Sequence, residues 1–168
     1  AAYKVFDDVI FWLEPPLPPK DQSYPHIDAV VFLPRLETAI FLEAKRINNP
    51  TRKKRELIND ACRMLMPKNR QHVTKGASFH IERHIVVLMA DVWLETRHKR
   101  FIPYWWTSAD KHKPAEKSPL KSTFVEEIRK TGHQWNEKDQ SVHAIKDEKS
   151  ESVLDKYRLL FGYHEIVP

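Results

Sequence analysis

The chain has 168 residues, of which 41% are hydrophobic, and it contains five Trp and eight Phe. This apolar content is enough for one domain with a substantial core and excludes an intrinsically disordered tail. A single cysteine, Cys62, excludes an internal disulfide framework and is typical of a reducing compartment, which predicts a cytoplasmic location. No apolar run approaches the ~20 residues that span a bilayer, so no membrane contact is expected.

Positive charge is concentrated in one part of the chain, which carries a net charge of +5 overall. Residues 1–44 contain three Lys/Arg and seven Asp/Glu, whereas residues 45–75 contain ten Lys/Arg and two Asp/Glu. The rest of the chain is nearly neutral. A strongly basic stretch that follows directly on an acidic one suits a polyanionic partner such as nucleic acid.

The first apolar segment, Tyr3–Leu13, fits either a short helix or a strand, because Val9–Leu13 has the length and composition of a buried strand. The run Pro15–Pro19 (PPLPP) ends it, since proline lacks an N–H donor and has a fixed φ. This run is interpreted as a rigid connector, with a docking site for a proline-binding module as the alternative.

Two short apolar runs follow, Ala29–Leu33 and Thr38–Leu42. They are rich in Val, Ile and Phe, which predicts buried strands. The four residues between them, 34–37, have the length of a hairpin turn. We therefore expect an antiparallel pair at the centre of the fold.

Charged residues mark the open end of this hairpin. A hairpin symmetric about the bond between Arg35 and Leu36 places Asp28 directly opposite Glu43. Lys45 lies two residues beyond Glu43 and is therefore expected on the same face of the strand. Like charges in facing positions need a cation between them, which either Lys45 or a divalent metal would supply. A slip of one residue would move the two acids to opposite faces.

A helix is predicted to start at Asn49-Pro50-Thr51 and to end at Pro67. Its apolar stripe consists of Leu57, Ala61 and Leu65. The first turn carries four cations where the helix dipole prefers anions, namely Arg52, Lys53, Lys54 and Arg55. Two interpretations stay open: a bound phosphate relieves this conflict, or the cations form a solvated surface.

The remaining chain is predicted in less detail. Residues 68–82 fit a loop or short helix, and Ile85–Val92 fits a strand that returns beside Thr38–Leu42, parallel to it, as in a βαβ unit. Further expectations are an edge strand at Phe101–Thr107, an exposed loop at 108–122, a helix at Thr123–Lys130 ended by Gly132, and a helix at Ser152–Phe161.

Asp28, followed by Glu43-Ala44-Lys45 at the end of an apolar strand, resembles the signature of the PD-(D/E)xK nuclease superfamily. The resemblance covers about residues 26–92, where hairpin, helix and next strand occur in the order of the restriction-endonuclease-like fold. It implies an α/β fold with a mixed central sheet flanked by helices. The chain is accordingly expected to form one domain, residues 1–168, with a core at about 26–107 and a peripheral loop and helices at 108–168.

The resemblance also implies the roles of the site residues. Asp28 and Glu43 would hold Mg²⁺ or Mn²⁺ with the carbonyl of Ala44, and Glu14 is the expected additional acid. Lys45 would orient the attacking water. A metal held by hard oxygen ligands lowers the pKa of bound water and shields the charge on phosphorus, which phosphodiester hydrolysis requires.

The predicted function is therefore metal-dependent hydrolysis of nucleic acid, with DNA favoured over RNA. The cations expected to hold the phosphate backbone are Arg46, Arg52, Lys53, Lys54 and Arg55. A homodimer would suit double-strand cutting, although no segment identifies an interface. Three departures from the family pattern are Ile27 before the aspartate, where the motif has proline, a following helix without Gln or Tyr, and only 27 residues before Asp28, where the fold has a helix and a strand.

Three alternatives stay open at this point. One is a nucleic-acid-binding module with the same fold that does not cut. Another is a protein-interaction domain that uses the aromatic run Tyr104-Trp105-Trp106. A zinc site at His72, His80 and His84 is the third, although it lacks a convincing fourth ligand.

Overall fold

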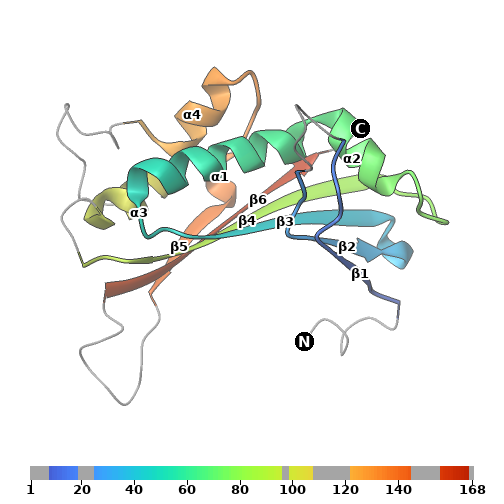
Figure 1. The fold of residues 1–168 in the computed structure, drawn as a ribbon, viewed down its shortest axis with the longest axis horizontal. Helices are drawn as coiled ribbons and strands as arrows, with labels where there is room; N and C mark the ends of the chain where they lie inside the picture. The colour runs from blue at the N-terminus through green and yellow to red at the C-terminus, as the bar shows by residue number, and fades with distance from the viewer. Residues whose placement is uncertain (1–7, 19–24, 96–98, 108–121, 145–155, 167–168) are drawn as a thin grey trace, which may run out of the picture. The chain divides into compact units, whose positions relative to one another are not determined.

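The structure, a computed structural model, describes residues 8–18, 25–95, 99–107, 122–144 and 156–166. Within these residues, six strands form one sheet in the order β1-β2-β3-β4-β6-β5 (Figure 1). The expected α/β class with a mixed sheet is confirmed. The strands are β1 (Ile10–Leu13), β2 (Ala29–Leu33), β3 (Thr38–Arg46), β4 (Arg83–Trp93), β5 (Gln140–Ala144) and β6 (Tyr157–Ile166). The helices are α1 (Pro50–Leu65), α2 (Pro67–Thr74), α3 (Ile102–Thr107) and α4 (Phe124–Lys130), with short 3₁₀ turns η2 (Pro34–Leu36), η3 (Lys99–Phe101) and η4 (Glu137–Asp139).

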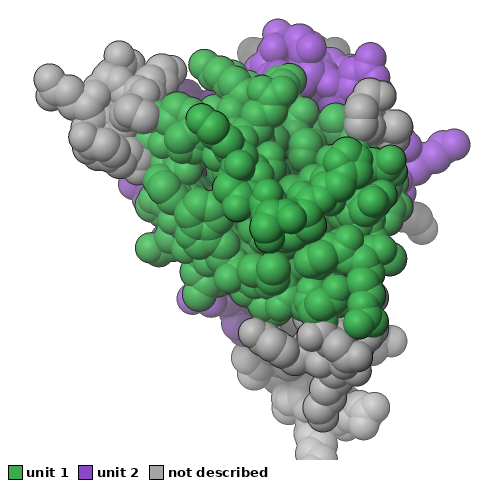
Figure 2. Space-filling view, turned by 90° about the vertical axis from the view of Figure 1, so that its right-hand side faces the viewer, with its two compact units in different colours: residues 1–43, 60–87, 163–168 green, residues 44–59, 88–162 purple. Residues whose placement is uncertain are grey.

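The chain divides into two compact units. Unit 1 comprises residues 1–43, 60–87 and 163–168, and it forms one continuous body in Figure 2. Unit 2 comprises residues 44–59 and 88–162. The boundaries fall inside secondary-structure elements, because β3 and α1 each begin in one unit and end in the other.

Strands β1 and β2 and residues 38–43 of β3 belong to unit 1, where β2 pairs with both neighbours in antiparallel fashion. The turn between β2 and β3 closes on Glu37, which adopts φ 48° and donates its N–H to the Pro34 carbonyl at 3.0 Å. Alternate side chains of the two strands are buried, including Val30, Phe32 and Phe41. This alternation fixes which face of each strand packs into the core.

Helix α1 confirms the predicted boundaries. Its start is capped by the Asn49 side chain, which accepts a hydrogen bond from the Arg52 N–H at 3.1 Å. The predicted stripe is buried, with Leu57 and Ala61 at 0% exposure and Leu65 at 7%. Pro67 separates α1 from α2, because a proline is tolerated in a first turn but not in a helix interior.

Unit 2 has a core of aromatic side chains. Trp105 and Trp106 of α3 pack against Phe124 of α4, with ring centroids 5.6 Å and 4.7 Å away, and Trp135 lies 5.3 Å from Phe124. Thr123 and Glu126 form a reciprocal capping box at the start of α4. The predicted helix at Thr123–Lys130 is therefore confirmed.

Two predicted elements are wrong. Phe101–Thr107, expected as an edge strand, contains helix α3, in which Pro103 occupies the first turn and Trp105 and Trp106 are fully buried. Tyr157–Phe161, expected within a helix, belongs to strand β6, where Leu160 and Gly162 are buried on one face. Residues 152–155 of that expected helix lie outside the described residues, as do 108–121 of the expected loop.

The C-terminal part of the chain thus contributes strands rather than peripheral helices alone. Strand β6 lies between β4 and β5 in the sheet, and β5 and β6 pair in antiparallel fashion. The predicted strand at Ile85–Val92 is confirmed as β4, next to β3. None of the described helices has the length and apolar character needed to cross a membrane.

Candidate functional site

The predicted hairpin register is confirmed. Ala29 pairs with Leu42, and the ladder continues to Leu33 and Thr38 at the turn. One step beyond Ala29 and Leu42, the same register brings Asp28 opposite Glu43.

Glu14 extends this row of acids to a third strand. Leu13 pairs with Ala29, and the Glu14 N–H donates to the Asp28 carbonyl at 3.0 Å, so Glu14 is opposite Asp28. Glu14 has φ 49°, in the left-handed region that residues other than glycine seldom adopt. Such backbone strain persists where the surrounding structure enforces it, and it is enriched at functional sites. The three acids therefore lie at one level of the sheet: Glu14 follows β1, Asp28 precedes β2, and Glu43 is within β3.

The three acids differ in exposure. Glu14 is exposed and Asp28 is half-buried, whereas Glu43 is only 2% exposed. Glu43 lies on the same face of β3 as the buried residues Ala39 and Phe41. Burying an ionised carboxylate is costly unless cations or hydrogen-bond donors compensate it. An ionised Glu43 at this depth therefore requires cations or hydrogen-bond donors beside it.

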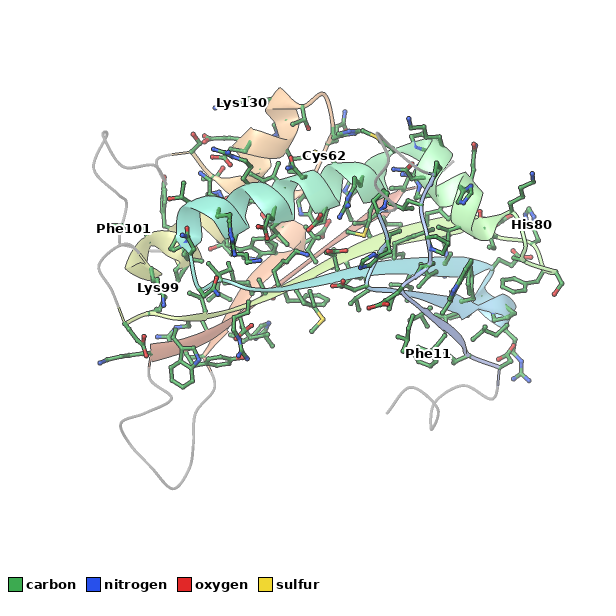
Figure 3. All side chains as sticks on the ribbon, viewed as in Figure 1. Phe11, Cys62, His80, Lys99, Phe101 and Lys130 are labelled. Atoms are coloured by element: carbon green, nitrogen blue, oxygen red, sulfur yellow. The ribbon has the colours of Figure 1, made fainter. Side chains whose placement is uncertain are left out.

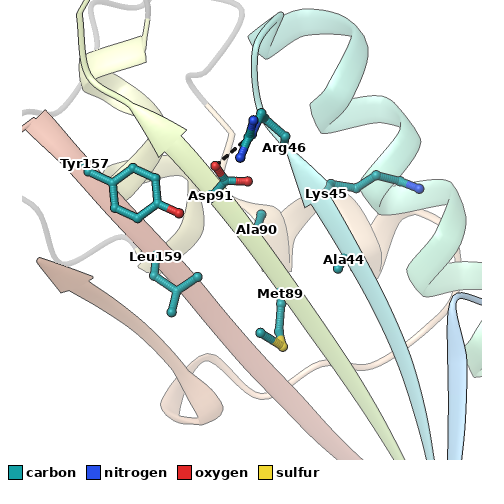
Figure 4. Close-up of a pocket in the computed structure, with 8 residues that line it drawn as sticks. All are labelled: Ala44, Lys45, Arg46, Met89, Ala90, Asp91, Tyr157 and Leu159. Atoms are coloured by element: carbon teal, nitrogen blue, oxygen red, sulfur yellow. Dashed lines mark hydrogen bonds and ion pairs between the residues drawn. The ribbon is translucent and has the colours of Figure 1, made fainter. Parts of the chain in front are cut away.

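Lys45 shares the face of β3 that carries Glu43, because the two residues are two positions apart. Its side chain is half-buried and extends toward α1 (Figure 4). There its charge, together with the charges of Lys53 and Arg52, lowers the pKa of Glu56, for which the hydrogen bond from Lys53 is the largest cause. No sequence pattern singled out Glu56; its spacing of four residues from Arg52 on α1 would have been the available signal.

The chemistry of a carboxylate pair limits which metal ions it could hold. Among the described residues, no three His, Cys, Asp or Glu side chains gather closely enough to hold a metal ion. Mg²⁺ is commonly held by one or two carboxylates, with water and substrate phosphate completing its octahedron. Facing carboxylates at Asp28 and Glu43 have the hard oxygen donors that this ion and Mn²⁺ prefer.

The cations of α1 are partly engaged by one acid. Glu56 accepts a hydrogen bond from Lys53 Nζ at 2.6 Å and lies 3.3 Å from Arg52 Nε. The Arg52 side chain is nevertheless 65% exposed, and Arg55 is exposed as well. Both arginines line a cavity of about 310 Å³ near the start of α1. Both guanidinium groups are therefore accessible to solvent.

Lys54 occupies a different environment from the other cations. Its Nζ donates to Glu127 Oε1 at 2.6 Å and lies 5.7 Å from the centroid of the Trp105 ring. The Lys54 side chain is only 12% exposed. In the structure, Lys54 therefore fastens α1 to α4 and to the aromatic core of unit 2.

Arg46 pairs with a residue that sequence patterns did not indicate. Its Nε donates to Asp91 Oδ2 at 3.1 Å, and Asp91 also contacts Tyr157 (Figure 4). The three residues come from β3, β4 and β6, which are distant in the chain and adjacent in the sheet. Only the sheet order brings them together, so no local spacing could have revealed them.

The three histidines considered for zinc do not share a helix face. His72 lies on α2, His84 on β4, and His80 in the exposed segment between them (Figure 3). The His84 ring packs edge-on against Phe41, with centroids 5.6 Å apart. His84 is therefore part of the packing of unit 1.

Comparison with known proteins adds no assignment: no family model, no curated protein and no solved structure matches this chain.

Proposed function

We propose that the chain is a metal-dependent nuclease of the PD-(D/E)xK superfamily with a restriction-endonuclease-like core. It hydrolyses phosphodiester bonds in nucleic acid, with DNA favoured over RNA. The observation that carries the proposal is the hairpin register, which puts Asp28 opposite Glu43 at the end of the strand that also bears Lys45.

The order of elements supports the same proposal. Three antiparallel strands, β1 to β3, are followed by α1 and α2 and then by β4, which is the neighbour of β3 in the sheet. In the described part of unit 2, the ends of β3 and β4 point the same way (Figure 4). This is the strand–helix–strand arrangement expected from the family resemblance.

Each site residue has a chemical role in the proposed reaction. Asp28 and Glu43 are the carboxylates that would hold Mg²⁺ or Mn²⁺, with the Ala44 carbonyl as a further oxygen ligand and Glu14 as the outer acid. The bound ion supplies a lowered pKa of its coordinated water and shields charge on the phosphoryl oxygens. Lys45, as an ammonium, donates hydrogen bonds that orient the attacking water. The exposed Arg52 and Arg55 hold the phosphate backbone.

Plasmid cleavage tests the proposal. The parent is incubated with supercoiled DNA and Mg²⁺, Mn²⁺ or EDTA, beside Asp28→Asn, Glu43→Gln and Lys45→Ala. We expect metal-dependent nicking or linearisation by the parent and a rate loss on the order of 10²- to 10³-fold in each variant, as when one charge-stabilising group is removed from an active site.

Glu37→Gln is the matched control, because Glu37 is an exposed acid at the turn of the same hairpin. It should cleave at the parental rate, and circular dichroism should show that all variants are folded. Parental rates in Asp28→Asn and Lys45→Ala would refute the site. Salt-sensitive DNA binding by a parent that never cleaves would instead support a non-cleaving nucleic-acid-binding module.

A further inference from the structure

A pocket of about 450 Å³ opens in unit 2 beside the ends of β3 and β4 and the start of β6 (Figure 4). This size falls within the range of about 300–1,000 Å³ that is typical of small-molecule sites. The residues that line it are Ala44, Lys45, Arg46, Met89, Ala90, Asp91, Tyr157 and Leu159. The proposed nuclease site uses only the first two of them.

One side of the pocket is a polar rim. Asp91 is the centre of this rim: it accepts a hydrogen bond from Arg46 Nε at 3.1 Å and one from the Tyr157 hydroxyl. The pKa of Tyr157 is raised, mainly by burial and further by the Asp91 charge and this hydrogen bond, so the hydroxyl keeps its proton. The edge-on contact of the Trp93 ring, 5.1 Å away, fixes the Tyr157 ring in place.

The rim retains hydrogen-bonding capacity toward the pocket. A guanidinium has five N–H donors, and the Arg46 side chain is 74% exposed. Asp91 can accept further hydrogen bonds on its carboxylate oxygens, and the Tyr157 oxygen has lone pairs beyond the bond that it donates. Donors and acceptors thus lie side by side along one edge.

The floor of the pocket is apolar and contributed by Ala44, Met89 and Leu159. A thioether and a branched aliphatic chain pack well against the flat face of an aromatic ring. An apolar floor beside a mixed donor and acceptor rim is complementary to a nucleobase, which has a π face and a polar edge. A simple anion could pair with Arg46, but it would leave the apolar floor uncovered and the acceptors on Asp91 and Tyr157 unused.

We propose that this pocket binds one unpaired base of the nucleic-acid substrate. The inference rests on the proposed function, because it assumes nucleic acid as the ligand, and it adds a preference for substrates with a base outside a duplex. A paired base has its edge engaged by its partner and its faces covered by stacking, so it cannot present both to this pocket.

The position of the pocket on β3 links it to the proposed chemistry. Ala44 and Arg46 alternate with Glu43 and Lys45 along the strand, so the two pairs project from opposite faces of the same strand end. A base seated on one face would hold the chain of the substrate at the strand that carries the catalytic residues.

Anisotropy of a fluorescein-labelled oligonucleotide in EDTA tests the base pocket without cleavage. The probes are a short single strand of mixed sequence and the blunt duplex made from it. We expect the parent to bind the single strand more tightly than the duplex. Single-strand binding should weaken in three pocket variants, Leu159→Glu, Asp91→Asn and Tyr157→Phe. The largest expected loss of affinity is roughly 5- to 150-fold, the contribution of one stacked base. Duplex binding should be unchanged in Asp91→Asn and Tyr157→Phe.

Two controls match these variants. Leu36→Glu places the same new charge on an exposed leucine of the hairpin turn, and Tyr163→Phe removes a hydroxyl from an exposed tyrosine of the same strand, β6. Both should bind like the parent. Tyr157→Phe and Asp91→Asn keep the test decisive if Leu159→Glu fails to fold.

The outcomes separate the base pocket from the nuclease proposal. If the parent cleaves plasmid and Asp91→Asn and Tyr157→Phe bind the single strand as tightly as the parent does, the base pocket is overturned and the nuclease proposal stands. If the parent never cleaves but binds the single strand more tightly than the duplex, and the pocket variants lose this difference, the base pocket is supported and the nuclease proposal fails. Equal affinity of the parent for a mononucleotide and the single strand would overturn the assignment in favour of a free-nucleotide site.

Discussion

The packing of unit 2 leaves no room for a side chain at Gly162. Gly162 of β6 lies against the buried Trp106, and an added Cβ would meet the Trp106 ring at 2.8 Å. That ring is held in place by its Nε1, which donates to the Phe161 carbonyl at 3.1 Å. A glycine is required here by the approach of a rigid side chain rather than by backbone conformation.

Gly162→Ala should therefore destabilise the protein by about 1–3 kcal/mol, the usual effect of overpacking. Chemical denaturation monitored by tryptophan fluorescence would measure it. Gly76→Ala is the matched control, because nothing lies within 4 Å of the added Cβ. It should leave stability unchanged or raise it by up to about 1 kcal/mol through the unfolded chain. Equal stability of the two variants would contradict the Trp106 contact.

A second prediction at this scale concerns His84. Its pKa is lowered from its ordinary value of 6.5 by burial and by the nearby charge of Arg70. The folded state thus binds the proton less readily than the unfolded state. The stability that depends on neutral His84 is complete above about pH 6.5 and is lost as the pH falls through the folded pKa.

Thermal unfolding from pH 7.5 to 5.0 should show this loss in the parent and a flatter profile in His84→Gln, which cannot titrate. His80→Gln is the comparison, since His80 is 70% exposed. It should follow the parent across the same range. Identical profiles for all three proteins would show that His84 titrates normally.

At the scale of elements, the parts that could be predicted are those defined by local pattern. The hairpin β2–β3 was predictable in register, because alternating apolar residues and a short turn leave one pairing that buries Val30, Phe32 and Phe41. Helices α1 and α4 were predictable because Asn49 and Thr123 signal their starts. The predicted hairpin register also placed Asp28 opposite Glu43.

The elements that were mispredicted depend on distant partners. The aromatic run in α3 has strand propensity, but burial of Trp105 and Trp106 against Phe124 favours a helix. The sequence 152–161 has a helical spacing of Val153, Tyr157 and Leu160, yet residues 157–161 belong to β6, between β4 and β5. Its position in the sheet depends on segments far away in the chain. For the same reason, Asp91 and Tyr157 could not be predicted as neighbours of Arg46.

For the whole molecule, the unevenly distributed charge has a measurable consequence. Arg46 and the four cations at 52–55 were predicted to hold the phosphate backbone, but these side chains differ in exposure. Arg52 and Arg55 are exposed, whereas Lys54 is 12% exposed and held 2.6 Å from Glu127. Only cations that reach phosphate release counterions when nucleic acid binds.

The salt dependence of duplex binding should therefore separate these cations. Measured in EDTA by anisotropy, the slope of log K against log salt should become shallower by about 0.9 in Arg52→Gln and again in Arg55→Gln, which is the contribution of one phosphate contact on B-DNA. Lys54→Met should keep the parental slope and instead lower the unfolding midpoint, because it removes the bond to Glu127 and the contact with the Trp105 ring. A shallower slope in Lys54→Met, with unchanged stability, would mean that Lys54 leaves Glu127 for the phosphate backbone, and that the cations of α1 bind nucleic acid together after all.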